Sequence, residues 1–118
     1  MNDQGDLFAP PTALWSRLGT SQAAAAEIEE HLNRLEEEVL LAVLLLGGCT
    51  CDQVEVALEM RHQTASARLN QLEHREYVMD SGSRRPTRSG RMAMVYRLTT
   101  AGRAVAIELG KRRREAQR

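Results

Sequence analysis

The chain has 118 residues, which is enough for one domain with a single modest core. Aromatic residues make up only 3% of it, which argues against a single-strand binder built on aromatic stacking platforms. The net charge is zero, but the residues up to Met60 carry eleven acids and two bases, whereas the later residues carry five acids and fourteen bases. Thirteen of those fourteen bases are arginine, and so basic a half is typical of a nucleic-acid surface.

Residues 1–20 are expected to form a flexible leader, because they show no apolar periodicity and contain two adjacent prolines. Residues 21–118 would then form the domain. The leader segment QGDLF resembles the peptide that binds the bacterial sliding clamp, and the matching residues are Gln4, Asp6, Leu7 and Phe8. The alternative is that Leu7 and Phe8 fold back on the domain or have no role.

Neither a secretory signal nor a membrane span is recognisable in the sequence. The N-terminus is acidic and contains proline, and the longest apolar run, Val39 to Leu46, is too short to cross a bilayer. We therefore expect a cytoplasmic protein.

The first helix is expected from Ser21, as its cap, to about Leu32. Asn33 followed by Glu36 matches a capping box and predicts a second helix that ends at Gly47. One apolar stripe of that helix comprises Leu35, Val39, Ala42, Val43 and Leu46, and its other faces carry Leu40, Leu41, Leu44 and Leu45. A helix that is apolar all round must be covered on both sides, which favours a homodimer; the alternative is that the first helix covers the second face.

A second capping box, Thr50 with Gln53, predicts a third helix with Val54, Ala57 and Leu58 facing inward. A break near Glu59 to Arg61 separates it from a fourth helix, from about His62 to Arg75. The spacing of Ala65, Leu69 and Leu72 predicts that these three residues face the core.

After Tyr77 the period changes to that of strands, which are expected over Tyr77 to Ser81 and Arg91 to Leu98 with a loop from Gly82 to Gly90 between them. A last helix would be capped by Thr99 or Thr100 and would face the core through Ala101, Val105 and Leu109. The expected fold class is therefore mainly α with a small β-hairpin (α+β), with extra helices at both ends.

This order of elements is that of a winged helix-turn-helix. The segments RHQTASARLNQLEHREYVMDSG and VYRLTTAGRAV resemble the recognition helix, the wing and the following helix of MarR-like regulators. The string HQTASAR, with RRPTRSGR and VYR, is similar to small winged-helix proteins encoded by bacteriophages. The resemblance covers roughly Leu35 to Leu109, and Glu59 stands in the turn where glycine is common.

The resemblance implies a sequence-specific transcription regulator that binds double-stranded DNA as a homodimer, with one helix in the major groove and the wing on the backbone or in the minor groove. The base-facing candidates are Gln63, Thr64, Ser66 and Asn70. The phosphate-facing candidates are Arg61, His62, Arg68, Arg84, Arg85, Thr87, Arg88, Ser89 and Arg91, with Arg88 the candidate for the minor groove. The alternative is that the wing arginines only keep an exposed hairpin soluble.

The two cysteines, Cys49 and Cys51, are too close in sequence to form an ordinary disulfide with each other, which favours a reducing compartment. We expect no metal site, because a lone C-x-C lacks the second pair of a structural zinc site, despite His31, His62 and His74. A redox switch at the cysteines is disfavoured by the neighbouring Asp52.

No cofactor and no catalysis are expected, since the sequence shows no phosphate-binding loop, nucleophile elbow or paired carboxylates. The alternative function, from another class, is an interaction protein on a winged-helix frame. It would bind a replication or transcription component through the acidic half or the leader.

Overall fold

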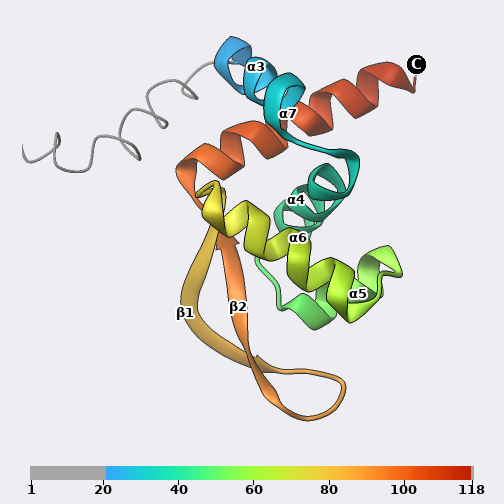
Figure 1. The fold of residues 1–118 in the computed structure, drawn as a ribbon, viewed down its shortest axis with the longest axis vertical. Coiled ribbons are helices and arrows are strands. Elements are labelled where there is room, and N and C mark those ends of the chain that lie inside the picture. Colours follow the sequence, from blue (N-terminus) through green and yellow to red (C-terminus); the bar gives the residue numbers. More distant parts are fainter. Residues whose placement is uncertain (1–20, 118) are drawn as a thin grey trace, which may run out of the picture.

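The computed structural model describes residues 21–117, which form helices and one antiparallel hairpin (Figure 1). The elements in chain order are α3 (Ser21–His31), α4 (Arg34–Leu46), α5 (Cys51–Leu58), α6 (His62–His74), β1 (Val78–Pro86), β2 (Met92–Leu98) and α7 (Thr100–Ala116). This confirms the expected α+β class. None of the helices in residues 21–117 has both the length and the apolar character needed to cross a membrane.

The helix boundaries follow from the capping residues that the sequence contains. Asn33 and Glu36 bond each other's backbone N–H groups at 2.9 and 3.0 Å, which closes the capping box of α4. Thr50 and Gln53 form the same arrangement at the start of α5. Gly47 ends α4 in the left-handed conformation that glycine adopts without strain. Of the two candidates for capping α7, Thr99 is the residue that accepts from the backbone.

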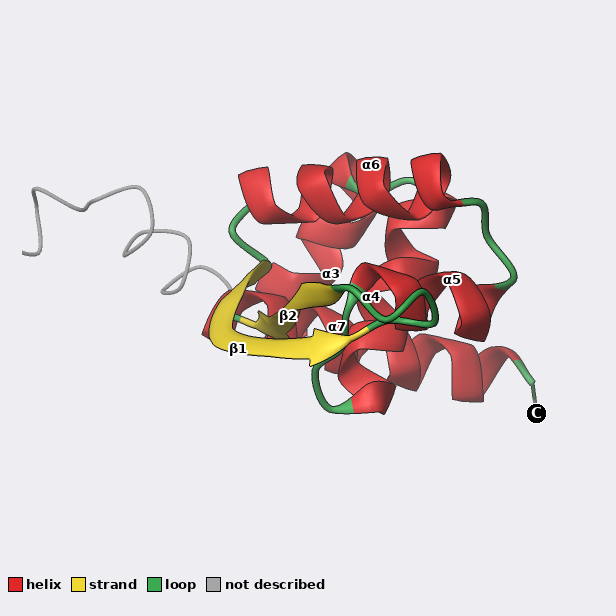
Figure 2. Cartoon of the chain, turned by 90° about the horizontal axis from the view of Figure 1, so that it is seen from below, coloured by secondary structure: helices red, strands yellow, loops and turns green. Residues whose placement is uncertain are grey.

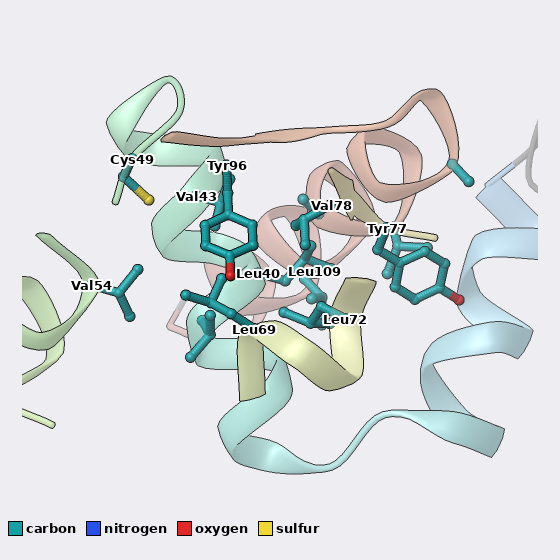
Figure 3. Close-up of a cluster of buried hydrophobic side chains, with 14 of the residues drawn as sticks. Leu40, Val43, Cys49, Val54, Leu69, Leu72, Tyr77, Val78, Tyr96 and Leu109 are labelled. Atoms are coloured by element: carbon teal, nitrogen blue, oxygen red, sulfur yellow. The ribbon is translucent and has the colours of Figure 1, made fainter. Parts of the chain in front are cut away.

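The core lies where α4, α6, α7 and the base of the hairpin meet. Figure 3 shows Leu40 of α4, Leu69 of α6 and Tyr96 of β2 close together in this cluster. The predicted core positions of α6 (Ala65, Leu69, Leu72) and of α7 (Ala101, Val105, Leu109) are all buried. A pair of backbone hydrogen bonds between Cys49 and Tyr96 joins the loop before α5 to the hairpin, so the helices and the hairpin form one unit.

The predicted inner faces of α4 and α5 were partly wrong. In α4 the buried face includes Leu40 and Glu36, whereas Leu35 and Leu46 are exposed. In α5 only Val54 is buried, because Ala57 lies at the surface. In α4 the difference arises because the neighbouring helices select the covered face, which an all-round apolar helix does not specify by itself.

Glu36 is almost fully buried, at 1% exposure, although it is a carboxylate. Its Oε2 accepts from Nε of Arg75 at 3.2 Å, and its Oε1 accepts from the backbone N–H of Asn33. Arg75 also donates to the backbone carbonyl of His31. The pair therefore ties the start of α4 to the end of α6, and a buried charge requires such a partner.

The hairpin is longer than the sequence predicted. β1 continues through Gly82 to Pro86, with an irregularity in pairing between Asp80 and Arg84, and the turn is confined to residues 87–91. Gly82 has a φ of 89°, which explains how a residue that reads as a loop signal can lie within a bulged strand. Arg84 and Arg85 therefore lie on β1. The prediction that they lie in the loop is wrong.

The outer face of α4 is not covered by the first helix, α3. α3 packs on α7 through Ala24 and Ile28. It does not cover the outer face of α4, where Leu45 is 81% exposed. Among the described residues, the alternative in which the first helix covers that face is thus wrong.

Candidate nucleic-acid interface

α6 presents a polar outer face, as predicted. Gln63 and Asn70 are exposed, and Thr64 and Ser66 are half-buried beside the buried Ala65. Arg61, the residue before the helix, is exposed and makes no side-chain capping bond. Short polar side chains with an arginine at the helix start can approach base edges and phosphates together.

Arg68 differs from the other predicted phosphate ligands. Its Nε atom is buried and has no hydrogen-bond partner among the described residues. The inner part of its side chain is therefore packed against the protein, so only the end of the guanidinium group is available to a phosphate.

The hairpin arginines are engaged with acceptors of the same chain. Arg84 contacts both carboxylate oxygens of Asp80, at 3.1 and 3.3 Å, and Arg85 donates to Oε1 of Gln53 at 2.6 Å. Arg91, by contrast, is exposed, and its side chain has no partner within residues 21–117. Thr87 and Ser89 are hydrogen-bonded to each other at 3.0 Å across the tip.

The tip of the hairpin is docked on α5 through Arg88. Its Nη2 lies 2.7 Å from Oδ1 of Asp52 and 3.2 Å from Oε1 of Glu55. The hairpin curls so that its tip lies against α5 (Figures 1 and 2). Glu55 is also contacted from α6, because Nδ1 of His62 lies 2.8 Å from its Oε2. The two basic parts of the surface thus meet at the same acidic helix.

These contacts lower the pKa values of two carboxyl groups. The hydrogen bonds from Arg88 hold the pKa of Asp52 below its usual range. The backbone N–H of Gly82, helped by Arg84, lowers the pKa of Asp80 in the same way. Both carboxylates are charged at neutral pH and pair with the arginines beside them.

The cysteines are free thiols that stay protonated at neutral pH. Burial raises the pKa of Cys49 to about 11. Burial, followed by the hydrogen bond to Glu55, raises the pKa of Cys51 to about 12. Because the thiolate is the reactive form, these raised pKa values lower the reactivity of both thiols at neutral pH.

The arrangement of helices and hairpin matches solved structures of bacterial regulators. No protein-family model matches the sequence, and no curated protein matches it in sequence either. A MarR family transcription regulator, SP03579, is 19% identical with a TM-score of 0.61 over 98% of this chain and 68% of its own. The reduced form of MarR from E. coli is 17% identical with a TM-score of 0.56 over 92% of this chain and 74% of its own. The YusO protein from Bacillus subtilis is 14% identical with a TM-score of 0.58 over 97% and 74%.

The chain has the winged-helix fold of MarR-family regulators. α6 (His62–His74) is the helix for which a recognition role was expected, and β1 and β2 form the hairpin expected as the wing. The expected fold and the resemblance to MarR-like regulators are thereby confirmed. Glu59 is accommodated in the turn in the left-handed conformation, with a φ of 53°. The clamp-like residues Gln4, Asp6, Leu7 and Phe8 lie outside the described residues.

The sequence did not predict the role of α5, which is to hold the wing. Asp52, Gln53 and Glu55 hold the wing, yet α5 had been read only for its apolar face. Their partners lie 32 to 36 residues away in sequence, so no local pattern predicts the pairing. The separation of acids and bases between the two halves was the only available signal.

Proposed function

We propose that the protein is a transcription regulator that binds a specific double-stranded DNA sequence as a homodimer. The observation that carries this proposal is the combination, on one winged helix, of a polar outer face on α6 and a wing with four arginines. α6 would lie in the major groove, and the wing would contact the backbone or the minor groove.

The exposed amides of α6 suit adenine, because Gln63 and Asn70 can each donate and accept at one base edge. Arg61 and Arg91 are free to grip phosphates directly. Arg88 would first have to leave Asp52. Wing binding is then an exchange of protein carboxylates for DNA phosphates, which makes it dependent on salt and on the acids of α5.

The homodimer is supported by an apolar groove between α4, α5 and α7. The groove has a volume of about 550 Å³, and its wall includes Leu41, Leu45 and Ile107. Leu45 and Ile107 are 81% and 45% exposed, which is unusual for neighbouring large apolar residues on a monomer. A second copy would cover this face and would set the two recognition helices on successive major grooves of a two-fold site.

The test is fluorescence anisotropy of the purified protein on a random duplex library and on DNA upstream of its own gene, over a salt series. We expect tight binding to one sequence and a fall in affinity with salt. Six arginine–phosphate contacts per protomer set a limit of about −5 to the log–log slope. Gln63→Ala should relax the base preference, whereas Arg91→Ala should weaken all sequences about equally.

Arg103→Ala is the control, because Arg103 is an exposed arginine on α7 that lies beside the base of β2 and not at the wing tip or on α6. It should bind as the unaltered protein does. Weak binding that is equal on all sequences, or no binding, would contradict the proposal and favour the alternative of an interaction protein.

A further inference from the structure

Three side chains of different chemistry converge where α5 meets the start of α6. Sγ of Cys51 lies 3.5 Å from Oε2 of Glu55 and 3.8 Å from Nδ1 of His62, and that nitrogen is 2.8 Å from the same carboxylate oxygen. One sulfur, one oxygen and one nitrogen therefore form a small triangle. Such a trio contains the three ligand types that proteins use to bind zinc.

We infer that Cys51, Glu55 and His62 form a binding site for a divalent cation of the zinc class. Zinc bonds are about 2.3 Å to sulfur and about 2.0–2.2 Å to nitrogen and oxygen, so two ligands at a tetrahedral angle lie roughly 3.4–3.6 Å apart. The two distances to sulfur are close to this value, and the third would have to widen by about half an ångström. A rotation of the exposed His62 ring is enough for that adjustment.

The backbone presets this arrangement. Cys51 and Glu55 are four residues apart on α5, so their side chains lie on one face of the helix. The left-handed turn at Glu59 brings His62, the first residue of α6, back over that face. Arg88 holds Oε1 of Glu55 at 3.2 Å, which leaves Oε2 directed at the cysteine and the histidine. A carboxylate that binds a metal is usually oriented by a further hydrogen bond of this kind.

The ligand types select the cation. A thiolate with an imidazole nitrogen suits Zn²⁺, whereas Mg²⁺ and Ca²⁺ prefer oxygen ligands alone. Binding would release the thiol proton that Cys51 now donates to Glu55 and would use the unprotonated form of Nδ1. Three protein ligands leave the fourth tetrahedral position to a water molecule.

Occupation would join the two helices of the helix-turn-helix. At present His62 and Cys51 are linked to Glu55 by hydrogen bonds, with His62 71% exposed and able to swing away. A cation would replace these bonds with metal–ligand bonds and fix the start of α6 on α5. The inference is independent of DNA binding, since the site is tested on the protein alone.

The experiment is a titration of the reduced, chelator-treated full chain with Co²⁺, followed by absorption spectroscopy and then by displacement with Zn²⁺. We expect one Co²⁺ per chain with a sulfur-to-cobalt charge-transfer band, which Zn²⁺ removes. Cys51→Ser should abolish the band, and His62→Gln should weaken binding at least about tenfold. Zn²⁺ should also raise the unfolding temperature of the unaltered chain but not that of Cys51→Ser.

The chain offers a matched control for each ligand. Cys49→Ala removes the other thiol, and His74→Gln removes an exposed histidine at the far end of α6; both variants should keep the band. Circular dichroism checks that each variant is folded. The inference is overturned if the unaltered chain gives no charge-transfer band, or if the band survives in Cys51→Ser, or if it is lost equally in Cys49→Ala.

Discussion

Arg88 at the tip of the wing is fastened to Asp52 at the start of α5 by both its side chain and its backbone. Nη2 lies 2.7 Å from Oδ1, and the backbone N–H of Arg88 donates to Oδ2 at 3.1 Å. The wing arginine that we propose for the minor groove is thus paired with a carboxylate of the same chain.

Asp52→Asn is expected to raise DNA affinity about two- to tenfold, because it removes the charge that competes with phosphate for Arg88. The measurement is anisotropy on the preferred duplex at fixed salt. Glu59→Gln is the control, since it removes one charge from the end of the same helix without touching the wing. Equal gains in the two variants would show that only net charge matters and that the contact does not restrain the wing.

Leu45→Glu should give a monomer, because a charge at the most exposed leucine of the groove would have to be buried at the interface. Light scattering after size-exclusion chromatography measures the mass. The variant should stay folded, since Leu45 makes little contact within the protomer. Met92→Glu, at an exposed apolar position on the wing, should keep the mass of the unaltered protein; a dimer in both variants would contradict the proposed interface.

Arg75→Met should lower the free energy of unfolding by about 3 kcal/mol, because it leaves the buried Glu36 carboxylate without its cationic partner. Urea unfolding followed by circular dichroism measures the change. The double variant with Glu36→Gln should be more stable than Arg75→Met alone, because the buried charge is then absent. Arg103→Met, at an exposed position, should change stability by less than about 0.5 kcal/mol.

The two helical glycines of α7 should respond in opposite directions to alanine. A Cβ at Gly102 would overlap the backbone carbonyl of Tyr77, so Gly102→Ala should cost at least about 2 kcal/mol. A Cβ at Gly110 would meet only the end of Arg114, at 3.8 Å, so Gly110→Ala should stabilise the protein by about 0.5–1 kcal/mol. Thermal unfolding of both variants is the measurement. A loss of stability in Gly110→Ala, or none in Gly102→Ala, would contradict the packing of α7 described for these two positions.

Asp80 should make the free energy of unfolding depend on pH in the acidic range. Its pKa is lowered in the folded chain, so its contribution is complete above the ordinary aspartate pKa of about 3.9 and is lost as the pH falls through the lowered value. The difference in unfolding free energy between the unaltered chain and Asp80→Asn should therefore be constant above about pH 5 and shrink below about pH 4. A difference that is the same at pH 3 and pH 7 would contradict the contact.

The helices were predictable because their ends are encoded locally. Asn33, Thr50 and Thr99 mark helix starts through bonds to residues no more than three positions away. The three inward positions of α6 follow from its period in the same manner. Such local patterns predict the length of a helix. They also predict which of its faces is buried when only one face is apolar.

The wing, by contrast, was only partly predictable. Gly82 by itself predicts a turn. It lies within a strand because β1 pairs with β2 on both sides of it, and no neighbouring residue in the sequence indicates this pairing. The buried Glu36 depends on an arginine 39 positions later. The trio around Glu55 was missed for the same reason, since its histidine comes from the next helix.

The acids of one half of the chain act as built-in counterions for the arginines of the other. Arg113 faces Glu37 and Glu38, as Arg88 faces Asp52 and Glu55. Added salt weakens these internal pairs as well as contacts with phosphate, so it frees arginines while it screens the DNA. The salt dependence of binding should therefore be shallower than the number of phosphate contacts implies. For this protein those contacts have to be counted one substitution at a time.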